Sequence, residues 1–309
     1  DAETLDRFYR QRIWLGVEGN VAENVFANVT MEFEKEWGKN NATPATPTAT
    51  LVYGYVNLSK LFDKDLSLKI GRQPYQLNKN NFVLWDNANG LDGMSLTCAS
   101  IKDWTFDALY FKVNSDTTAE DGDKDDQEVY GVVANYKGIE KNNIQAYLLF
   151  DRNANADDKS DLKQYLGLRG EGAITSIDGL SYIAELILLS GDDGKVPKNK
   201  YRSSLYYLNA NYEIKDMSNL TFIVDYLVAS GDNDGVTDHK DKNFKISSVA
   251  GNQNLVGNFN FDFGLDASRI NIVDTDLYSN IKVLGLGLSV KPTEKLSLGA
   301  KYSILNKNK

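Results

Sequence analysis

The chain has 309 residues, of which 25% are charged, and its mean hydropathy is −0.41. No run reaches the roughly 18 to 20 apolar residues of a membrane-spanning helix, which excludes a helical membrane protein. One cysteine, Cys98, excludes an internal disulfide and a cysteine metal cluster, and one histidine, His239, leaves little for histidine-based catalysis. The net charge of −9 argues against non-specific nucleic-acid binding.

Segments of about ten residues alternate between apolar and polar positions along the whole chain, which is the period of a β-strand. Tyrosine, phenylalanine and glycine are abundant while proline is scarce, and this composition also favours β-structure. In chain order the alternation predicts about 14 strands: 7–18, 26–37, 50–58, 66–76, 91–98, 104–113, 128–136, 144–151, 162–172, 180–189, 204–214, 220–229, 281–290 and 295–305.

The connections between these strands alternate between short and long. The short ones are 19–24, 59–65, 99–103, 138–143, 173–179, 215–219 and 291–294. The long, polar ones are 38–49, 77–90, 114–127, 152–161, 190–203 and 230–280. Outer-membrane barrels have tight periplasmic turns and long external loops, so we predict an all-β, transmembrane antiparallel β-barrel as a single domain over residues 1–309.

The longest connection, 230–280, contains the apolar stretch 255–265 and is predicted to be an extracellular loop with an extra hairpin or a plug. The first strand precedes a short turn and the last follows one, whereas both ends of a bacterial barrel normally lie in the periplasm. We therefore expect an incomplete barrel, with at least one further strand on each side. A full count of 16 to 18 strands leaves a water-filled lumen.

Several motifs occur in a recognisable order: "RQRIWLGVEG" (10–19), "YVNL" (55–58), "LKIGRQPYQL" (68–77), "WDNANGLDGMSL" (85–96) and "YLVASGD" (226–232). Together they resemble the alginate-export-type family of bacterial outer-membrane porins. The resemblance implies a barrel of about 18 strands that passes anionic polysaccharide or small solutes. An alginate conduit needs a strongly cationic lumen, whereas this acidic chain has only eight arginines. The architecture and the porin role carry over; the alginate substrate does not.

Charged positions predict which face of each strand meets water, because a lipid-facing Arg or Lys near the midplane costs roughly 2–4 kcal/mol. Arg10 and Arg12 should face the lumen beside Glu32 and Glu34 of the next strand, where cross-strand ion pairs can form. The same argument adds six residues to the predicted lumen wall: Lys69, Arg169, Glu171, Glu185, Asp225 and Lys301.

Arg72 breaks the alternation of its strand, because Leu66, Leu68 and Ile70 share its parity. Either a bulge after Gly71 turns it inward or it lies near the membrane surface. We expect the bulge, because the resemblance identifies GRQ as an inner-wall motif.

These observations favour a passive outer-membrane porin for small hydrophilic solutes or ions, in contact with membrane lipid and lipopolysaccharide. We expect no enzymatic activity, no cofactor, no metal site and no nucleic-acid partner. The alternatives are a structural barrel whose acidic loops, 115–128 and 230–242, bind a surface partner, and a soluble β-domain. Those loops lack the spacing of an EF-hand calcium site.

Overall fold

A computed structural model describes residues 9–37, 48–78, 80, 82–84, 90–114, 127–155, 159–195, 197–232, 239–247 and 279–308. Two 3₁₀ turns, η1 (Leu61–Asp63) and η2 (Lys215–Met217), lie between strands. Within these ranges no helix is long and apolar enough to cross a membrane. The strands are β1 (Tyr9–Ala22), β2 (Val25–Trp37), β3 (Thr48–Leu58), β4 (Leu66–Gln73), β5 (Leu91–Cys98), β6 (Trp104–Asn114), β7 (Gln127–Tyr136), β8 (Asn142–Asn155), β9 (Lys159–Ala173), β10 (Leu180–Asp192), β11 (Lys200–Ile214), β12 (Leu220–Ala229), β13 (Lys240–Asp241), β14 (Ile281–Thr293) and β15 (Leu296–Lys307).

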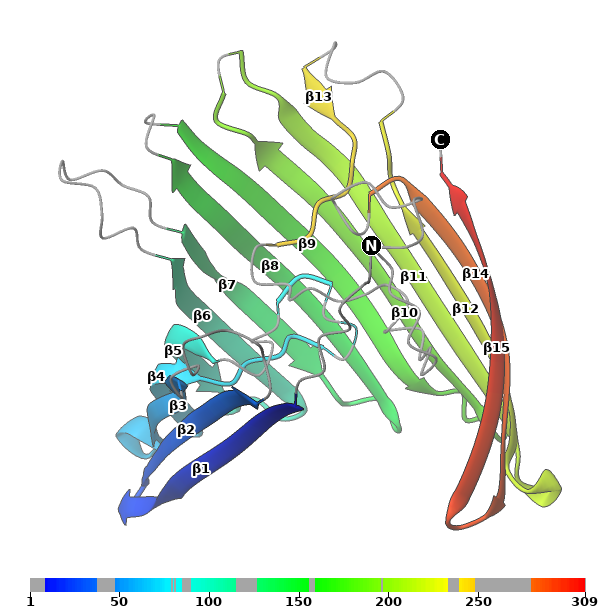
Figure 1. Cartoon of the computed structure of the whole chain (residues 1–309), viewed down its shortest axis with the longest axis horizontal. Coiled ribbons are helices and arrows are strands. Elements are labelled where there is room, and N and C mark those ends of the chain that lie inside the picture. Colours follow the sequence, from blue (N-terminus) through cyan, green and yellow to red (C-terminus); the bar gives the residue numbers. More distant parts are fainter. Residues whose placement is uncertain are drawn as a thin grey trace.

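The strands form one sheet in chain order, and all neighbours are antiparallel except the short β13, which pairs in parallel with β11. Figure 1 shows this sheet curving around a concave inner side. The tight turns lie at one end, called here the short-turn end, and the longer connections lie at the other, the long-connection end. Within the described residues β1 and β15 do not pair with each other. The expectation of further strands beside them stays a prediction.

All fourteen strands expected from the alternation are present, so the predicted β-architecture is confirmed. The prediction of a long connection at 152–161 is wrong. β8 and β9 continue through most of it, and their pairing extends to Asn155 opposite Lys159. Polar residues suit strands that project beyond a membrane, so the loss of apolar alternation did not end the ladder there. Residues 248–278, which include the expected hairpin at 255–265, lie outside the described residues.

The convex outer face is apolar. Directly paired residues point to the same side of a sheet, so the register shows which side chains share this face. One continuous row joins Val132, Leu148, Leu166 and Leu188 across four neighbouring strands. These side chains remain exposed although they are apolar; Leu166, for example, is 54% exposed. A row of exposed aliphatic side chains around the outside is the surface expected against lipid.

Aromatic side chains flank this aliphatic row. Tyr110, Tyr130 and Phe150 are paired across β6, β7 and β8 towards the long-connection end, and the rings of Tyr130 and Phe150 stack at 5.2 Å. Trp104 and Tyr136 are paired at the short-turn end, with ring centroids 4.7 Å apart. Two aromatic girdles separated by aliphatic residues are typical of barrel surfaces at the two membrane interfaces.

The concave inner face is also apolar over part of its height, and this was not expected for a lumen wall. Buried residues such as Phe111, Leu149, Ile187, Leu205 and Leu227 form one cluster on it. They are buried because two segments between strands fold onto the inner face and cover them. Those segments belong to the connections β4–β5 and β12–β14, and they position the candidate site.

Candidate pore constriction

The connection after β4 turns into the interior instead of projecting outwards. Its described residues, 74–78, 80 and 82–84, are called here the inner segment. Leu77 and the run Phe82, Val83 and Leu84 are buried in the interior cluster, and the Leu77 amide donates to the Leu84 carbonyl oxygen at 3.1 Å. Burying each such side chain contributes roughly 1.5–3 kcal/mol. Because this apolar run has no place in water, the segment folds inwards.

A second connection also returns to the inner wall. The Tyr165 hydroxyl donates to the Lys245 carbonyl oxygen at 3.1 Å, and the Tyr165 and Phe244 rings meet edge to face at 6.5 Å. Phe244 is fully buried. Residues 239–247 therefore add to the material inside the curved sheet at the long-connection end.

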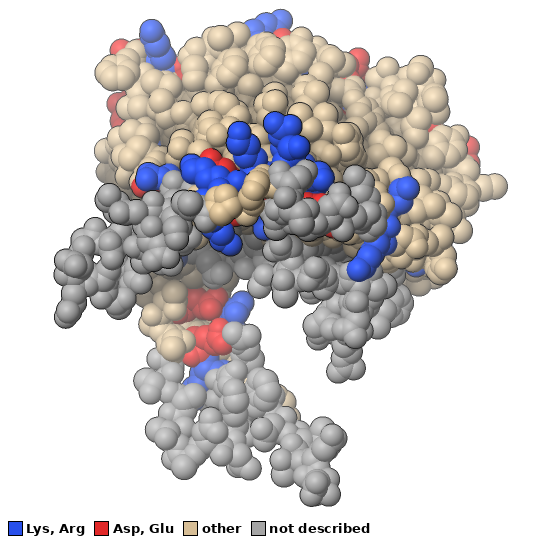
Figure 2. Space-filling view, turned by 90° about the horizontal axis from the view of Figure 1, so that it is seen from above, with Lys and Arg blue, Asp and Glu red and all other residues tan. Residues whose placement is uncertain are grey.

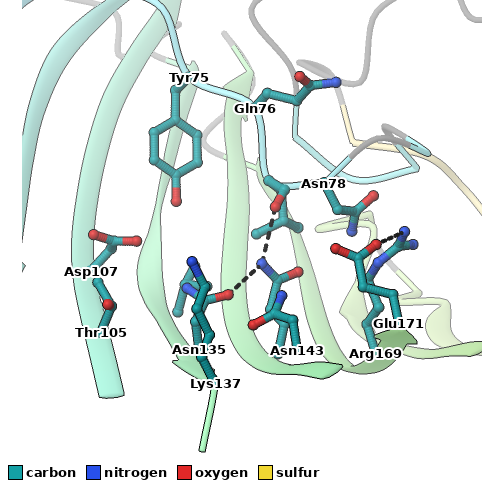
Figure 3. A pocket seen from close by; sticks show the side chains of 13 residues that line it. Tyr75, Gln76, Asn78, Thr105, Asp107, Asn135, Lys137, Asn143, Arg169 and Glu171 are labelled. Carbon is teal, nitrogen blue, oxygen red and sulfur yellow. Dashed lines mark hydrogen bonds and ion pairs between the residues drawn. The ribbon is translucent and has the colours of Figure 1, made fainter. Parts of the chain in front are cut away.

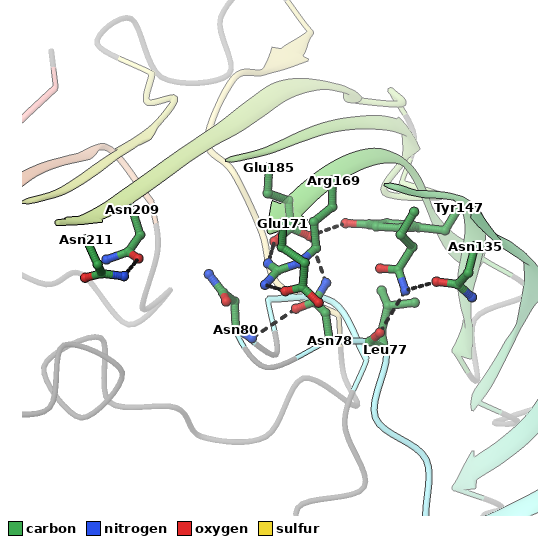
Figure 4. Close-up of polar contacts among 11 residues, drawn as sticks. Leu77, Asn78, Asn80, Asn135, Tyr147, Arg169, Glu171, Glu185, Asn209 and Asn211 are labelled. Atoms are coloured by element: carbon green, nitrogen blue, oxygen red, sulfur yellow. Dashed lines mark hydrogen bonds and ion pairs between the residues drawn. The ribbon is translucent and has the colours of Figure 1, made fainter. Parts of the chain in front are cut away.

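Glu185 of β10 is the central acceptor of a buried polar network. Its Oε2 accepts from Arg169 Nη1 of β9 at 2.9 Å, and the two side chains are 0% and 1% exposed. Its Oε1 accepts from two further donors, the Tyr147 hydroxyl of β8 and Asn78 Nδ2 of the inner segment, each at 3.0 Å. Figure 4 shows these groups converging from three strands and the inner segment. Both Glu185 oxygens are therefore engaged, and the inner segment is attached to the wall through a charge-assisted bond.

Arg169 makes a second ion pair, in which Nη2 donates to Glu171 Oε2 at 2.8 Å. Glu171 is partly exposed, so the network extends from the buried pair towards the interior space. A further tether comes from Gln145 of β8, whose Nε2 donates to the Leu77 carbonyl oxygen and to Asn135 Oδ1, both at 3.0 Å. The inner segment is thus held by hydrogen bonds to both its backbone and a side chain.

A glycine allows the Tyr147 side chain to cross a strand. Tyr147 and Ile187 lie opposite Gly167 on its two sides, so the ring must pass over β9 to reach Glu185 on β10. A Cβ atom at Gly167 would overlap the Tyr147 ring. Glycine at this position therefore leaves the space for the bond.

A second side chain crosses a strand over a glycine near the edge of the sheet formed by β15. Lys301 of β15 forms an ion pair with Asp225 of β12, although β14 lies between them. The Lys301 side chain passes over Gly285, where an added Cβ would lie 2.9 Å from Lys301 Cε. Asp225 also accepts from Asn209 Nδ2 at 2.8 Å and from the Tyr207 hydroxyl at 2.9 Å.

The first hairpin brings together the arginines and glutamates expected there. Arg12 lies opposite Glu34 and bonds it at 3.3 Å through Nη2, while its Nε lies 3.3 Å from Glu32. Trp14 donates to Glu32 from the same face. Arg10 is in register with Glu36. Ile13, Leu15 and Val17 are on the opposite, exposed face.

Lys69 lies on the inner face of β4, over the Tyr55 ring at 5.2 Å from its centroid. Arg72 does not lie on the inner face, and the prediction of a bulge after Gly71 is wrong. The β4–β5 register is continuous, with Gly71 opposite Gly93 and Arg72 opposite Asp92. Gly71 adopts φ +117°, a conformation that only glycine takes easily, so the strand keeps its register without an extra residue.

Arg72 instead lies on the outer face at the long-connection end, 3.0 Å from Asp92. The paired row continues with Lys112, Glu128 and Arg152, so that charges of opposite sign alternate over β4–β8. About eight residues, or ~27 Å of strand, separate Arg152 from Ile144 at the short-turn end. With a tilt of roughly 40° this gives ~20 Å, close to the ~25 Å apolar band of such barrels. The row marks the expected outer boundary of the hydrocarbon.

Gln73 of the same motif is the residue that points inwards. It is fully buried, and its Nε2 donates to the carbonyl oxygens of Lys69 and Gly93 at 3.2 Å. Ser95 Oγ donates to its Oε1 at 2.8 Å. The inner-wall residue of the GRQ motif is therefore its glutamine.

A cavity of about 350 Å³ lies between the inner segment and the wall, on the short-turn side. Figure 3 shows Tyr75, Gln76 and Asn78 on one side of it and the wall residues on the other. Its charged lining consists of Asp107, Lys137, Arg169 and Glu171, and the rest is largely amide and hydroxyl groups. Within the described chain, no group of His, Cys, Asp or Glu could hold a metal ion.

The sequence reading missed Asp107, Gln145, Tyr147 and Asn78. The first three have the inward parity of their own strands, which could have identified them. Asn78 had no such signal, because its position depends on the fold of the connection. The apolar run 82–84 was the available hint that this connection turns inwards.

At the long-connection end the sheet carries a rim of basic side chains, which Figure 2 shows from above. Acidic groups lie close to basic ones near this end: Lys198 lies 3.3 Å from Asp192, and Lys245 lies 3.1 Å from Asp241. The rim is therefore mixed in charge.

Comparison with solved structures gives the same fold at low sequence identity. The outer membrane protein OprD from Pseudomonas aeruginosa is 15% identical, with a TM-score of 0.56 over 96% of this chain and 68% of that one. Pseudomonas aeruginosa OpdK with vanillate is 13% identical, with a TM-score of 0.59 over 96% and 76%. Salmonella typhi OmpF in complex with daunomycin is 10% identical, with a TM-score of 0.51 over 97% and 84%.

No curated protein sequence matches the chain significantly. A family model does: the one described as alginate export matches residues 5–309, nearly the whole length. This agrees with the curved antiparallel sheet, its apolar outer face and the ion pairs on its inner face. The chain belongs to the alginate-export family.

Proposed function

We propose that the chain is an outer-membrane porin through which small hydrophilic solutes or ions diffuse passively, along a water-filled path that the inner segment narrows. The chain is an integral β-barrel protein of the outer membrane. The observation that carries the proposal is the inward docking of the inner segment onto the Glu185 network, together with its buried run Phe82–Leu84. Such a segment reduces the free cross-section of the interior and does not itself cover the rest of the inner wall.

The inner-wall charges form the second part of the proposal. We assign the pore lining to Arg12 with Glu32 and Glu34, to Lys69, to Glu171, and to the Lys301–Asp225 pair, with Arg10 added by its register. Opposed basic and acidic groups along one wall create a transverse field that acts on permeating ions. Arg169 and Glu185 lie beneath the inner segment, and their role is to hold it. We leave Arg72 out of the lining, since its strand register faces it outwards.

Planar-bilayer recording tests the narrowing. Phe82→Ala removes a buried anchor of the inner segment. The centroid of the Phe82 ring lies 5.5 Å from that of Tyr207. Phe-to-Ala substitutions in a core cost roughly 3–5 kcal/mol, enough to loosen the segment. We expect ohmic channels from the unchanged protein and a larger, noisier conductance from Phe82→Ala. The control Leu166→Ala, on the outer face, should keep the original conductance. A silent bilayer with correctly folded protein contradicts the porin.

Ion selectivity tests the lining. Arg12→Gln removes the positive partner of Glu32 and Glu34 and leaves two carboxylates on that wall. We expect the reversal potential in a salt gradient to shift towards cation preference, with the shift shrinking as ionic strength rises. Gln11→Glu places the same change of charge on the neighbouring, outward-facing position. An equal shift from both variants contradicts the assignment of Arg12 to the pore.

A further inference from the structure

We propose that the cavity beneath the inner segment binds a small uncharged, polyhydroxylated solute, such as a hexose or hexitol. The inference rests on the proposed porin function, because the solute reaches this site through the pore. The cavity measures about 350 Å³, the volume of about a dozen water molecules. That is within the range of small-molecule pockets and accommodates one six-carbon solute with a few waters.

Amide side chains dominate the polar lining. They are Gln76, Asn78, Asn135, Asn143 and Gln145. A primary amide offers both a donor and an acceptor, which matches the hydroxyl group, itself donor and acceptor. The Tyr75 ring, whose centroid lies 5.5 Å from that of Phe111, adds an aromatic surface at the edge of the cavity.

The charges lining the cavity disfavour a charged solute. Arg169 is already paired with Glu171 and Glu185, so its positive charge is compensated and does not attract a carboxylate. Asp107 adds a negative charge across the cavity. Lys137 adds a positive charge that disfavours an ammonium group. An uncharged solute meets neither repulsion.

Two acceptors of the lining have no partner within the described residues. They are Asn143 Oδ1 and Gln145 Oε1, both buried. A buried acceptor without a hydrogen bond is energetically unfavourable. A solute with several hydroxyl groups supplies the missing donors, which neither side chain obtains from the wall.

Current block in planar bilayers tests the inference with three six-carbon probes of similar size: D-glucose, D-gluconate and D-glucosamine. We expect glucose to interrupt the current at the lowest concentration. Asn143→Leu and Gln145→Leu should each weaken the glucose block about 5- to 10-fold, because one hydrogen bond contributes about 1 kcal/mol. Ile144→Leu, on the outer face between them, should leave it within twofold. Asn143→Leu is the decisive variant, since Gln145 also holds Leu77.

Asp107→Asn tests the charge argument separately. It removes a negative charge near the site, so we expect the gluconate block to strengthen about threefold or more while the glucose block changes little. Gluconate binding as tightly as glucose in the unchanged protein, or an Asn143→Leu channel with unaltered glucose block, overturns the inference while ohmic conductance preserves the porin. Loss of all conductance overturns the proposed function and, with it, this inference.

Discussion

Removal of the Glu185 carboxylate should destabilise the wall, because it breaks a buried ion pair and a buried hydrogen bond. Among the described residues, Glu185→Leu leaves Arg169 with the partly exposed Glu171 as its one acidic partner. It also removes the acceptor for the Tyr147 hydroxyl and for Asn78. The substitution therefore leaves an undercompensated charge and two donors without their acceptor.

The expected magnitude follows from burial. Breaking a buried ion pair by removing one partner costs about 3–5 kcal/mol, and a buried donor without an acceptor costs about 1–3 kcal/mol. These terms overlap, so we expect Glu185→Leu to cost at least about 3 kcal/mol. The double variant Arg169→Met/Glu185→Leu removes both charges. The Tyr147 hydroxyl is then the one fully buried donor among these groups that has lost its acceptor, since Asn78 is only part-buried, so the cost should fall to about 1–3 kcal/mol.

The assay is reversible urea unfolding in lipid vesicles, followed by tryptophan fluorescence. It compares the unchanged protein with the single variants Arg169→Met and Glu185→Leu and with the double variant. A coupling energy of about 2 kcal/mol or more between the two positions is expected. If the double variant costs the sum of the single variants, the pair is not energetically coupled and the reasoning from burial fails. A Glu185→Leu variant as stable as the unchanged protein would refute it as well.

Gly167→Ala places a Cβ atom against the Tyr147 ring, and we expect it to cost about 1–3 kcal/mol in the same assay, as overpacking does. Gly170→Ala, where the nearest atom lies 3.6 Å away, should be close to neutral, and equal costs would contradict the crossing. At the short-turn end, Lys215 donates to the Asp178 carboxylate at 3.0 Å and holds the pKa of Asp178 below its ordinary value. Any stabilisation from this pair is present at neutral pH and is lost as the pH falls through that lowered pKa. Carboxyl NMR should show the low midpoint, and Lys215→Met should raise it; an unchanged midpoint would contradict the pair.

The sequence predicted the strands well because each strand alternates locally, and the period requires no knowledge of its neighbours. The same locality placed Arg12 beside Glu32 and Glu34, since a hairpin with a short turn fixes its own register. The prediction failed at Arg72, where the resemblance of GRQ to an inner-wall motif led us to expect an inward bulge. The charge is instead accommodated at the end of the strand, where an outward side chain reaches water and meets Asp92.

The inner segment was beyond local reasoning. Its position depends on contacts with residues more than sixty positions away along the chain, such as Gln145 and Glu185. The run 82–84 is too short to show a period, and the surrounding residues are polar. Its apolar character indicated burial but not where the burial occurs. Only the curvature of the sheet brings those partners to one place.

Side chains that cross a strand, such as those of Tyr147 and Lys301, explain how the wall is linked laterally beyond neighbouring strands. Adjacent strands are about 4.8 Å apart, so side chains two strands apart begin about 10 Å from each other. Only a long side chain reaches that far, and only over a strand without a Cβ in its path. Gly167 and Gly285 satisfy this condition for Tyr147 and Lys301.

Glycine weakens a strand by roughly 0.5–1 kcal/mol relative to alanine. At Gly167 and Gly285 this local cost is offset by a bond to the buried carboxylate of Glu185 or Asp225, which charge assistance makes worth about 1.5–3 kcal/mol. The net effect favours a wall in which three strands act as a unit. The inner segment rests on the first of these units, so its position is set by the strands β8, β9 and β10 together.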